Sequence, residues 1–328
     1  SAGKNGKLIR MSTRAYASAL RAEAGKKLRT ARRERYWEID FLRGVCVLLM
    51  VFDHFMYCLW DVMPAINSFL GTSLFADLRE TAMQYWNWNV RENVRGVVIC
   101  MFFVLCGISC TLTRGNLRRF VPLAAVAVGI SCVTYIIDEL FLEGIFIMFG
   151  VIHMIACGVL MFAVLDNAVS AVCALFPKGE SAKKAETVLR YLPGVFGVVL
   201  LIVEFSCFAD LRVTDGAVEL VSSVQSSGDY FTDVVRSIFI ELRGFNFLRE
   251  TNTSDYFPLL PYTAVILAGS ILGRAIYHTR AKNALRPLDG SWNGGICLLG
   301  RHSAFIFVAE MVVIPLFLAL CAFLTPLF

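Results

Sequence analysis

Several signatures of common function classes are missing from this chain of 328 residues. No two cysteines form a CxxC pair and only four histidines occur, so the sequence predicts no metal site. No GxGxxG motif or other glycine-rich phosphate loop is present, which removes the usual signal of a nucleotide site at a strand-to-helix turn. What the chain has in excess is hydrophobic sequence.

The composition is that of an integral membrane protein. Hydrophobic residues make up 57% of the chain and the mean hydropathy is +0.64, far above the values of a soluble domain. Apolar windows of about twenty residues, the length that crosses a bilayer as an α-helix, recur along the sequence. The predicted fold class is all-α: a polytopic transmembrane helix bundle of at least seven spanning helices plus an external amphipathic helix. The eleven cysteines lie mostly inside the apolar runs and are expected to be small, buried packing residues.

The distribution of charge predicts how the chain crosses the membrane. Residues 1–36 carry eleven Lys or Arg against two Glu, so this segment is expected to be cytoplasmic and to contact membrane lipids, not nucleic acid. Residues 37–328 are expected to form the transmembrane domain of a multi-pass plasma-membrane protein, with an inside N-terminus and an outside C-terminus. The spanning helices are expected at 39–61, 94–113, 120–137, 145–165, 191–209, 258–277 and 296–324.

Two segments between the spans carry patterns of their own. From Phe231 to Phe245, apolar residues recur at i, i+3 and i+4 spacing opposite charged ones, which is typical of an amphipathic helix on the outer surface or over a cavity. The stretch TAMQYWNWN at 81–89 is expected to lie in a loop. Its aromatic residues could form an interfacial belt or the wall of a sugar-binding mouth.

The first spanning helix is the most informative, because its apolar sequence EIDFLRGVCVLLMVFDHFMYCLWD contains ionisable residues. Charged groups in hydrocarbon cost several kcal/mol unless they are paired or hydrated, so such residues are functional candidates by default. Asp40 and Arg43 are three residues apart and are expected to form a buried structural pair. Asp40 and His54 share one stripe about 20 Å long. The stripe predicts a polar track that faces protein rather than lipid.

Several motifs, in order, resemble one family of membrane enzymes. The opening helix, with EIDFLRG followed by LLMVFDH, is similar to that of bacterial relatives of heparan-alpha-glucosaminide N-acetyltransferase. The further similar stretches are MFFVLCGISCTLTRGNLRR at 101–119, FGVIHMI at 149–155, DYFPLLPY at 255–262 and, as a weaker match, GRHSAFIF at 300–307. The resemblance implies a transmembrane enzyme that passes an acetyl or short acyl group from cytoplasmic acetyl-CoA to an acceptor outside.

Acyl transfer from a thioester needs a base that activates the acceptor hydroxyl or amine. His54 is the best candidate, because an imidazole can take a proton near neutral pH and an external acceptor can reach its depth. Asp53 is adjacent but points about 100° away, which makes it a poor orienting partner. The other catalytic candidates are His153, Glu204 and Glu310. In animal members of the family the catalytic histidine follows the outer end of this helix, so the resemblance leaves the role of His54 open.

The acetyl-CoA donor is expected to bind at the inner ends of the helices. Its nucleotide phosphates need cations, and basic residues gather where those ends are predicted. The predicted group consists of Arg43, Arg119, Arg274, Arg301 and His302. Short cationic loops often serve only to orient helices, and that alternative stays open for these residues.

A second function class fits part of this pattern. A proton-coupled transporter of a small polar solute would also place Asp, Glu and His in its helices, but would often show an internal repeat or paired broken helices, and neither is evident. An acyl-CoA-dependent N- or O-acetyltransferase is therefore the favoured prediction. Its expected partners are membrane lipids and an extracytoplasmic carbohydrate or similar acceptor, and a homodimer is left open.

Overall fold

The computed structural model divides the chain into two units, Ser1–Glu38 and Ile39–Phe328. Nearly all of the first unit lies outside the described residues, and so do the expectations for the basic N-terminal segment. The described residues are 35–113, 115–140, 145–176, 179–214 and 217–325.

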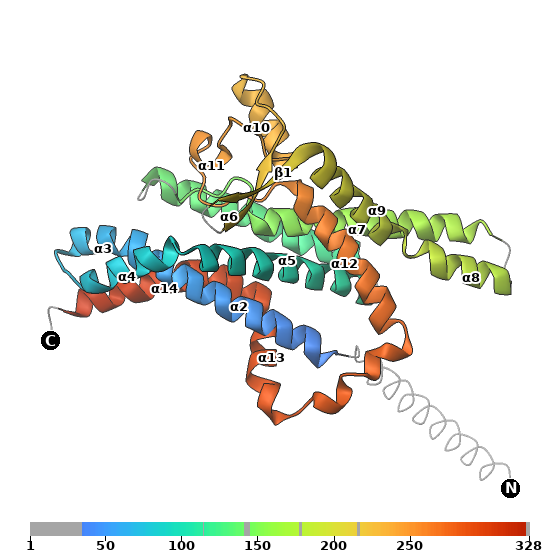
Figure 1. Ribbon diagram of the computed structural model, residues 1–328. Helices are drawn as coiled ribbons and strands as arrows, with labels where there is room; N and C mark the ends of the chain where they lie inside the picture. Colours follow the sequence, from blue (N-terminus) through green and yellow to red (C-terminus); the bar gives the residue numbers. More distant parts are fainter. Residues whose placement is uncertain (1–34, 114, 141–144, 177–178, 215–216, 326–328) are drawn as a thin grey trace, which may run out of the picture. The chain divides into compact units, whose positions relative to one another are not determined.

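Helices form most of the described part of the chain (Figure 1). Seven helical stretches in it are long and apolar enough to cross a membrane, which confirms the predicted all-α, multi-pass bundle. The helices are α2 (Trp37–Tyr57), α3 (Met63–Leu70), α4 (Ala76–Trp86), α5 (Asn89–Leu112), α6 (Asn116–Leu140), α7 (Val151–Ala174), α8 (Glu180–Leu189), α9 (Leu192–Val203), α10 (Tyr230–Phe239), α11 (Phe247–Glu250), α12 (Leu259–Tyr277), α13 (Gly294–Arg301) and α14 (Ser303–Leu324). Two π-helical turns, Cys58–Val62 and Glu204–Phe208, continue α2 and α9.

Two of the expected segments have a different structure. The stretch TAMQYWNWN was expected in a loop, but its first six residues complete helix α4. Ala, Leu, Arg, Glu, Met and Gln, which make up much of α4, are good helix formers and outweigh the aromatic residues at its end. The last span is not one continuous helix from 296 to 324, because the helix is interrupted at His302, between α13 and α14. Glycines in and before α13 lower its helix propensity, which reduces the free-energy cost of the interruption.

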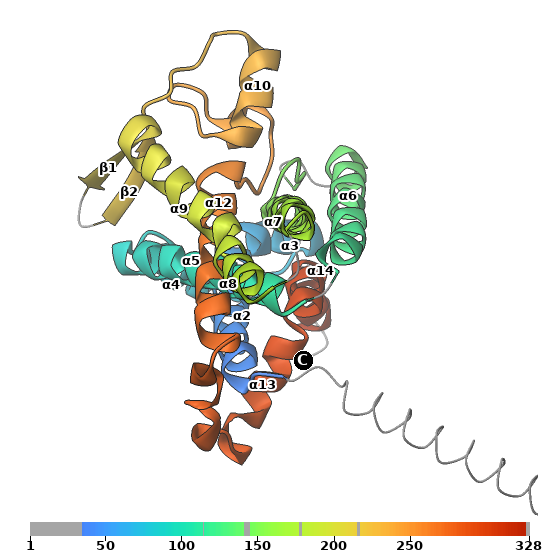
Figure 2. The same cartoon turned by 90° about the vertical axis from the view of Figure 1, so that its right-hand side faces the viewer.

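A segment that does not span the membrane connects α9 to α12. It begins with an antiparallel hairpin of β1 (Ala209–Thr214) and β2 (Ala217–Ser222), which the sequence analysis did not predict. The amphipathic helix predicted from 231 to 245 is present as α10, but it ends at Phe239. Figures 1 and 2 both show the hairpin and α10 on the same side of the bundle.

The serine-rich loop before α10 encloses a carboxylate. Asp233 is buried and accepts hydrogen bonds from Ser226 Oγ at 2.6 Å, Ser227 Oγ at 2.8 Å and the backbone amides of Ser227 and Gly228. Burial alone would raise the pKa of Asp233, but these donors outweigh burial and lower the pKa to about 2. The loop is therefore organised around a charged carboxylate.

Helix α12 packs closely against α5 on one side and α9 on the other (Figure 2). A Cβ at Gly269 of α12 would lie 2.6 Å from the backbone oxygen of Val104 on α5. A Cβ at Gly197 of α9 would lie 2.6 Å from the backbone nitrogen of Ala268. Glycine at these positions lets the backbones meet, as in tightly packed membrane helices.

All eleven cysteines are free thiols. Cys46, Cys106 and Cys110 are buried, as expected of small packing residues. Cys100 and Cys132 are exposed, so the expectation of burial is wrong for these two.

Candidate active site

The central pair of the candidate site joins helices α2 and α14. Nδ1 of His54 lies 2.7 Å from Oε1 of Glu310. The Glu310 side chain is 3% exposed and that of His54 is 39% exposed, so the carboxylate is enclosed while the imidazole remains accessible. The carboxylate orients the ring and favours a proton on Nδ1. No hydrogen bond to Nε2 is found among the described residues, and an unprotonated Nε2 is the acceptor that a general base needs.

The surroundings of Glu310 explain why the pair forms. Glu310 lies in the interior of α14 among apolar residues, where an unpaired carboxylate would be strongly destabilising. The nearby imidazole donor offsets that cost. The other carboxylate oxygen, Oε2, is buried and has no partner among the described residues. It can therefore accept a hydrogen bond from one further donor.

Asp53 faces a different helix from His54. Its two carboxylate oxygens each lie 2.7 Å from a guanidinium nitrogen of Arg91 on α5, and Tyr85 donates to it at 3.0 Å. Arg91 also lies over the ring of Trp86, 3.6 Å from its centroid. Asp53 therefore ties α2 to α5 and does not orient His54, in keeping with its predicted direction. Nothing in the sequence singles out Arg91, because a charge near a helix end is ordinarily solvated.

His153 has partners for both ring nitrogens. The backbone amide of Gly150 donates to Nδ1 at 3.3 Å, so Nε2 carries the proton and donates to Ser131 Oγ at 3.0 Å. Ser131 gives its own proton to the backbone oxygen of Ile147 at 2.7 Å. His153 thus stabilises the start of α7 and links it to α6. This arrangement favours a structural role over that of a base.

Asp255, which the sequence analysis did not select as a site residue, lies beside His153. The two line a small cavity together with Ile130, Ile147, Gly150, Val151, Ile152, Phe307 and Met311. Asp255 Oδ2 accepts from the backbone amide of Val151 at 3.0 Å. Burial raises the pKa of Asp255, and this amide and the charges of Arg95 and His54 partly oppose the rise. The ring of His54 lies 6.4 Å from that of Phe307, so the cavity adjoins the central pair.

Glu204 lies apart from this group. It occupies the π-helical turn after α9, is 4% exposed, and has one carboxylate oxygen without a partner among the described residues. The charge that acts on its carboxylate is that of Glu241. No contact in the described structure brings Glu204 to His54.

No direct ion pair between Asp40 and Arg43, as the sequence predicted, is found among the described residues. Arg43 donates from Nη2 to Oγ of Ser109 and, at 3.5 Å, to the backbone oxygen of Leu105, both on α5. Asp40 instead lies 3.1 Å from Nε of Arg301, at the end of α13. Each charge thus has a partner on a different helix.

Two glycines account for this exchange of partners. Gly44 on α2 and Gly300 on α13 bring the two backbones into contact, because a Cβ at Gly300 would overlap the backbone oxygen of Asp40. The close approach places Arg301 beside Asp40. Helical spacing alone could not reveal this contact, since it depends on a helix far away in the sequence.

Three of the predicted donor-binding cations gather at one end of α2. The electrostatic surroundings of Arg43 include Arg119 and Asp40, and Asp40 pairs with Arg301. His302 follows Arg301 at the break between α13 and α14 and is exposed. This end of α2 therefore carries several cations.

Arg274 is not part of that group. It is buried, and its Nη2 lies 2.6 Å from Oδ1 of Asp166 on α7. Arg190 lies 4.0 Å from the same oxygen. Because Arg274 is already neutralised by Asp166, it is not available to a phosphate in the way the sequence analysis expected.

A comparison with protein families identifies the chain. The family described as heparan-alpha-glucosaminide N-acetyltransferase, catalytic, matches residues 35–177 and 229–312, which is more than half of the sequence. The chain belongs to this family. With seven candidate spans in the described part of the chain, the protein is a transmembrane acetyltransferase, and the family resemblance noted in the sequence is confirmed. No curated protein and no solved structure matched the chain in the parallel comparisons.

The acetyltransferase match separates the candidate residues. His54 and Glu310 fall inside the matched segments, as do Arg43 and Arg301 at the other end of the site. Glu204 falls in 178–228, which the match omits. The family comparison and the contacts therefore agree in setting Glu204 apart from the central pair.

Proposed function

We propose that this acetyltransferase moves an acetyl group from acetyl-CoA on the cytoplasmic side to a hydroxyl or amine of an acceptor on the opposite side, with His54 as the general base. The observation that carries the proposal is the 2.7 Å contact between His54 Nδ1 and the buried carboxylate of Glu310, which leaves Nε2 free to take a proton. A carboxylate behind an imidazole is the arrangement by which many enzymes activate a nucleophile.

In the proposed reaction, one proton passes from the acceptor to His54. The acceptor oxygen or nitrogen attacks the thioester carbonyl carbon and gives its proton to Nε2 of His54. The carbon–sulfur bond breaks, and the CoA thiolate leaves and takes up a proton. Glu310 acts as a positioning residue, because its charge favours the imidazolium form that arises during transfer.

The donor is proposed to bind at the opposite end of α2. Arg43, Arg119 and Arg301 supply cations for the nucleotide phosphates, and Arg43 precedes His54 by eleven residues, or about 16 Å along the helix. The extended pantetheine arm of the donor would bridge that separation. Arg274 is left out of this proposal, because Asp166 neutralises it.

The sidedness and the acceptor are also proposals. Basic residues in the segments 115–119, 179–190 and 278–292 support a cytoplasmic position for the ends of the helices there. The family name refers to an amino sugar, which supports a carbohydrate acceptor outside.

Substitution of His54 tests the proposal directly. His54→Ala should stay folded and bind acetyl-CoA with nearly unchanged affinity, but lose about 10² to 10⁴ in transfer rate. His153→Ala is the control, since it removes a histidine whose two nitrogens serve a structural role. Transfer at the wild-type rate in His54→Ala, at equal protein levels, would refute His54 as the base.

A further inference from the structure

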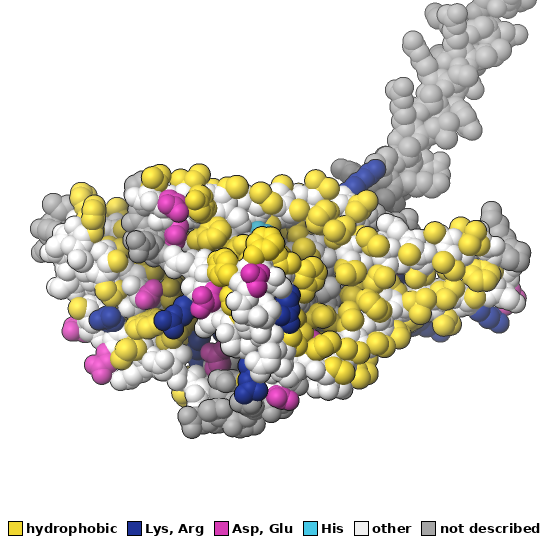
Figure 3. Space-filling model, turned by 90° about the horizontal axis from the view of Figure 1, so that it is seen from above, with side chains coloured by type: hydrophobic (Ala, Val, Ile, Leu, Met, Phe, Trp, Pro, Cys, Tyr) yellow, Lys and Arg dark blue, Asp and Glu magenta, His cyan; other side chains and the backbone are white. Residues whose placement is uncertain are grey.

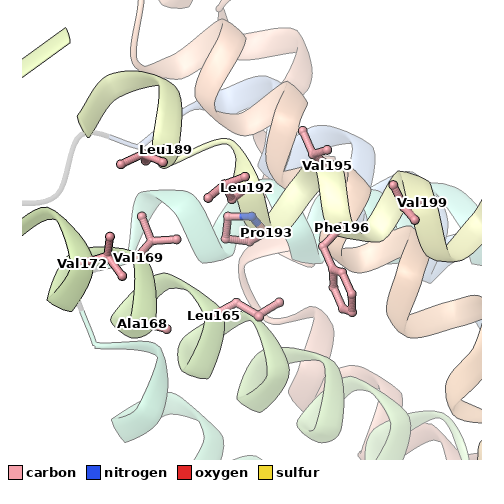
Figure 4. A pocket seen from close by; sticks show the side chains of 10 residues that line it. All are labelled: Leu165, Ala168, Val169, Val172, Leu189, Leu192, Pro193, Val195, Phe196 and Val199. Carbon is pink, nitrogen blue, oxygen red and sulfur yellow. The ribbon is translucent and has the colours of Figure 1, made fainter. Parts of the chain in front are cut away.

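An apolar groove lies between α7 and the junction of α8 and α9, away from the central pair (Figure 4). Its volume is about 500 Å³, within the usual range of ligand pockets. Every lining side chain is hydrophobic: α7 contributes Leu165, Ala168, Val169 and Val172, and the facing wall runs from Leu189 to Val199. A polar ligand would find no hydrogen-bond partner there.

The groove does not belong to the acetyl-transfer site. Helix α12 lies between α9 and α5, in backbone contact with both, and α5 is the helix that binds Arg43 and Asp53. One wall of the groove, 189–199, also lies in the part of the chain that the family match omits. The groove therefore calls for an occupant other than the acetyl donor or its acceptor.

The bilayer itself supplies an apolar occupant. Both walls belong to helices that can span a membrane, and in Figure 3 hydrophobic side chains cover much of the surface at the end of the molecule where α7 and α9 lie. A groove left empty in hydrocarbon would forfeit dispersion contacts along its whole lining, so an acyl chain is favoured to fill it.

Two exposed lysines lie on α8 near one end of the groove. Lys183 and Lys184 precede the lining residue Leu189 on the same helix, whereas Arg190 is already paired with Glu186 at 2.6 Å. Lys184 makes only a 3.8 Å contact with Glu180, with both side chains largely in solvent, so its ammonium is available to another anion. Figure 3 also shows Lys and Arg side chains at the end of the molecule where α8 lies.

We propose that the groove holds one acyl chain of a phospholipid, with the lipid phosphate beside Lys183 and Lys184. The apolar lining accounts for the chain and the α8 cations account for the phosphate. Such a lipid stabilises the fold by binding to the native state, and it takes no part in acetyl transfer.

Native mass spectrometry of the full-length, detergent-purified protein tests this site. The probes are palmitoyl-oleoyl phosphatidylglycerol and the diacylglycerol with the same two chains, which lacks the phosphate. We expect the wild type to retain one phosphatidylglycerol and little diacylglycerol. Ala168→Trp, which fills the groove, should lower phosphatidylglycerol retention on the order of tenfold. The matched control is Ala125→Trp, at an exposed alanine of α6.

A second variant leaves the groove itself intact. In the double variant Lys183→Gln/Lys184→Gln both substitutions are at exposed positions, so folding should be unaffected, and phosphatidylglycerol retention should again fall about tenfold. Unchanged retention in this variant, or equal retention of the two probes by the wild type, would overturn the phosphate contact. If Ala168→Trp instead changes the oligomeric mass and leaves lipid retention intact, the groove is an interface between copies and the proposal is wrong.

Discussion

Replacing Glu310 with glutamine removes one charge from the central pair and little else. Glutamine has nearly the same volume as glutamate, and its amide oxygen can still accept a hydrogen bond from Nδ1 of His54. The ring should therefore keep its orientation. What the substitution removes is the negative charge that faces the imidazolium when the base has taken up the acceptor proton.

The size of the effect can be worked from the contact distance. With Nδ1 and Oε1 2.7 Å apart, the two charge centres lie about 4 Å from one another, and at an effective dielectric constant of about 20 their attraction amounts to about 4 kcal/mol. Loss of that term should lower the transfer rate on the order of 10³-fold. Acetyl-CoA affinity should be nearly unchanged, because the donor cations lie about 16 Å away along α2.

The assay follows release of the free CoA thiol together with acetylation of the acceptor, at equal amounts of purified protein. Glu204→Gln is the matched control, because Glu204 and Glu310 are equally buried as whole residues and each has one unpartnered carboxylate oxygen among the described residues. If Glu310→Gln keeps the wild-type rate, or if Glu204→Gln loses as much activity as Glu310→Gln, the charge of Glu310 does not assist His54 in transfer.

Four further outcomes are expected. Arg119→Ala and Arg301→Ala should each weaken acetyl-CoA binding about tenfold or more, and added salt should weaken it further; titration calorimetry measures both effects. If both variants keep the wild-type affinity, the nucleotide binds elsewhere. Gly300→Val should lower the thermal unfolding midpoint, because a side chain there would separate α13 from α2, and an unaltered midpoint contradicts that contact. Because the pKa of Asp233 is lowered to about 2, its charged carboxylate stabilises the loop above about pH 4, and this stability is lost as the pH falls towards about 2. Asp233→Asn should abolish this pH dependence, as measured by hydrogen exchange of the neighbouring amides. Equal pH dependence in the two proteins would argue against the role of the carboxylate. A cysteine at position 183 in a cysteine-free background should react only with reagents applied from the cytoplasm, and labelling from outside would reverse the proposed topology.

The fold class, the seven spans and the first candidate base could all be predicted from the sequence. Whether a helix crosses a membrane depends on about twenty consecutive residues, which is a local property. His54 was recognisable for the same reason, because an ionisable side chain in an apolar run needs a compensating partner wherever that partner lies.

The partners themselves were decided by the tertiary structure. Asp40 pairs with Arg301 rather than Arg43, and Glu310 reaches His54 across 256 positions of sequence. These contacts depend on which helix faces meet, and contacts at single glycines such as Gly300 help to decide that. Helical periodicity gives the direction of a side chain about its own axis but holds no information about the neighbouring helix. For that reason the residues that could carry the chemistry were visible in the sequence, while the contact between His54 and Glu310 became visible only once α2 and α14 were packed together.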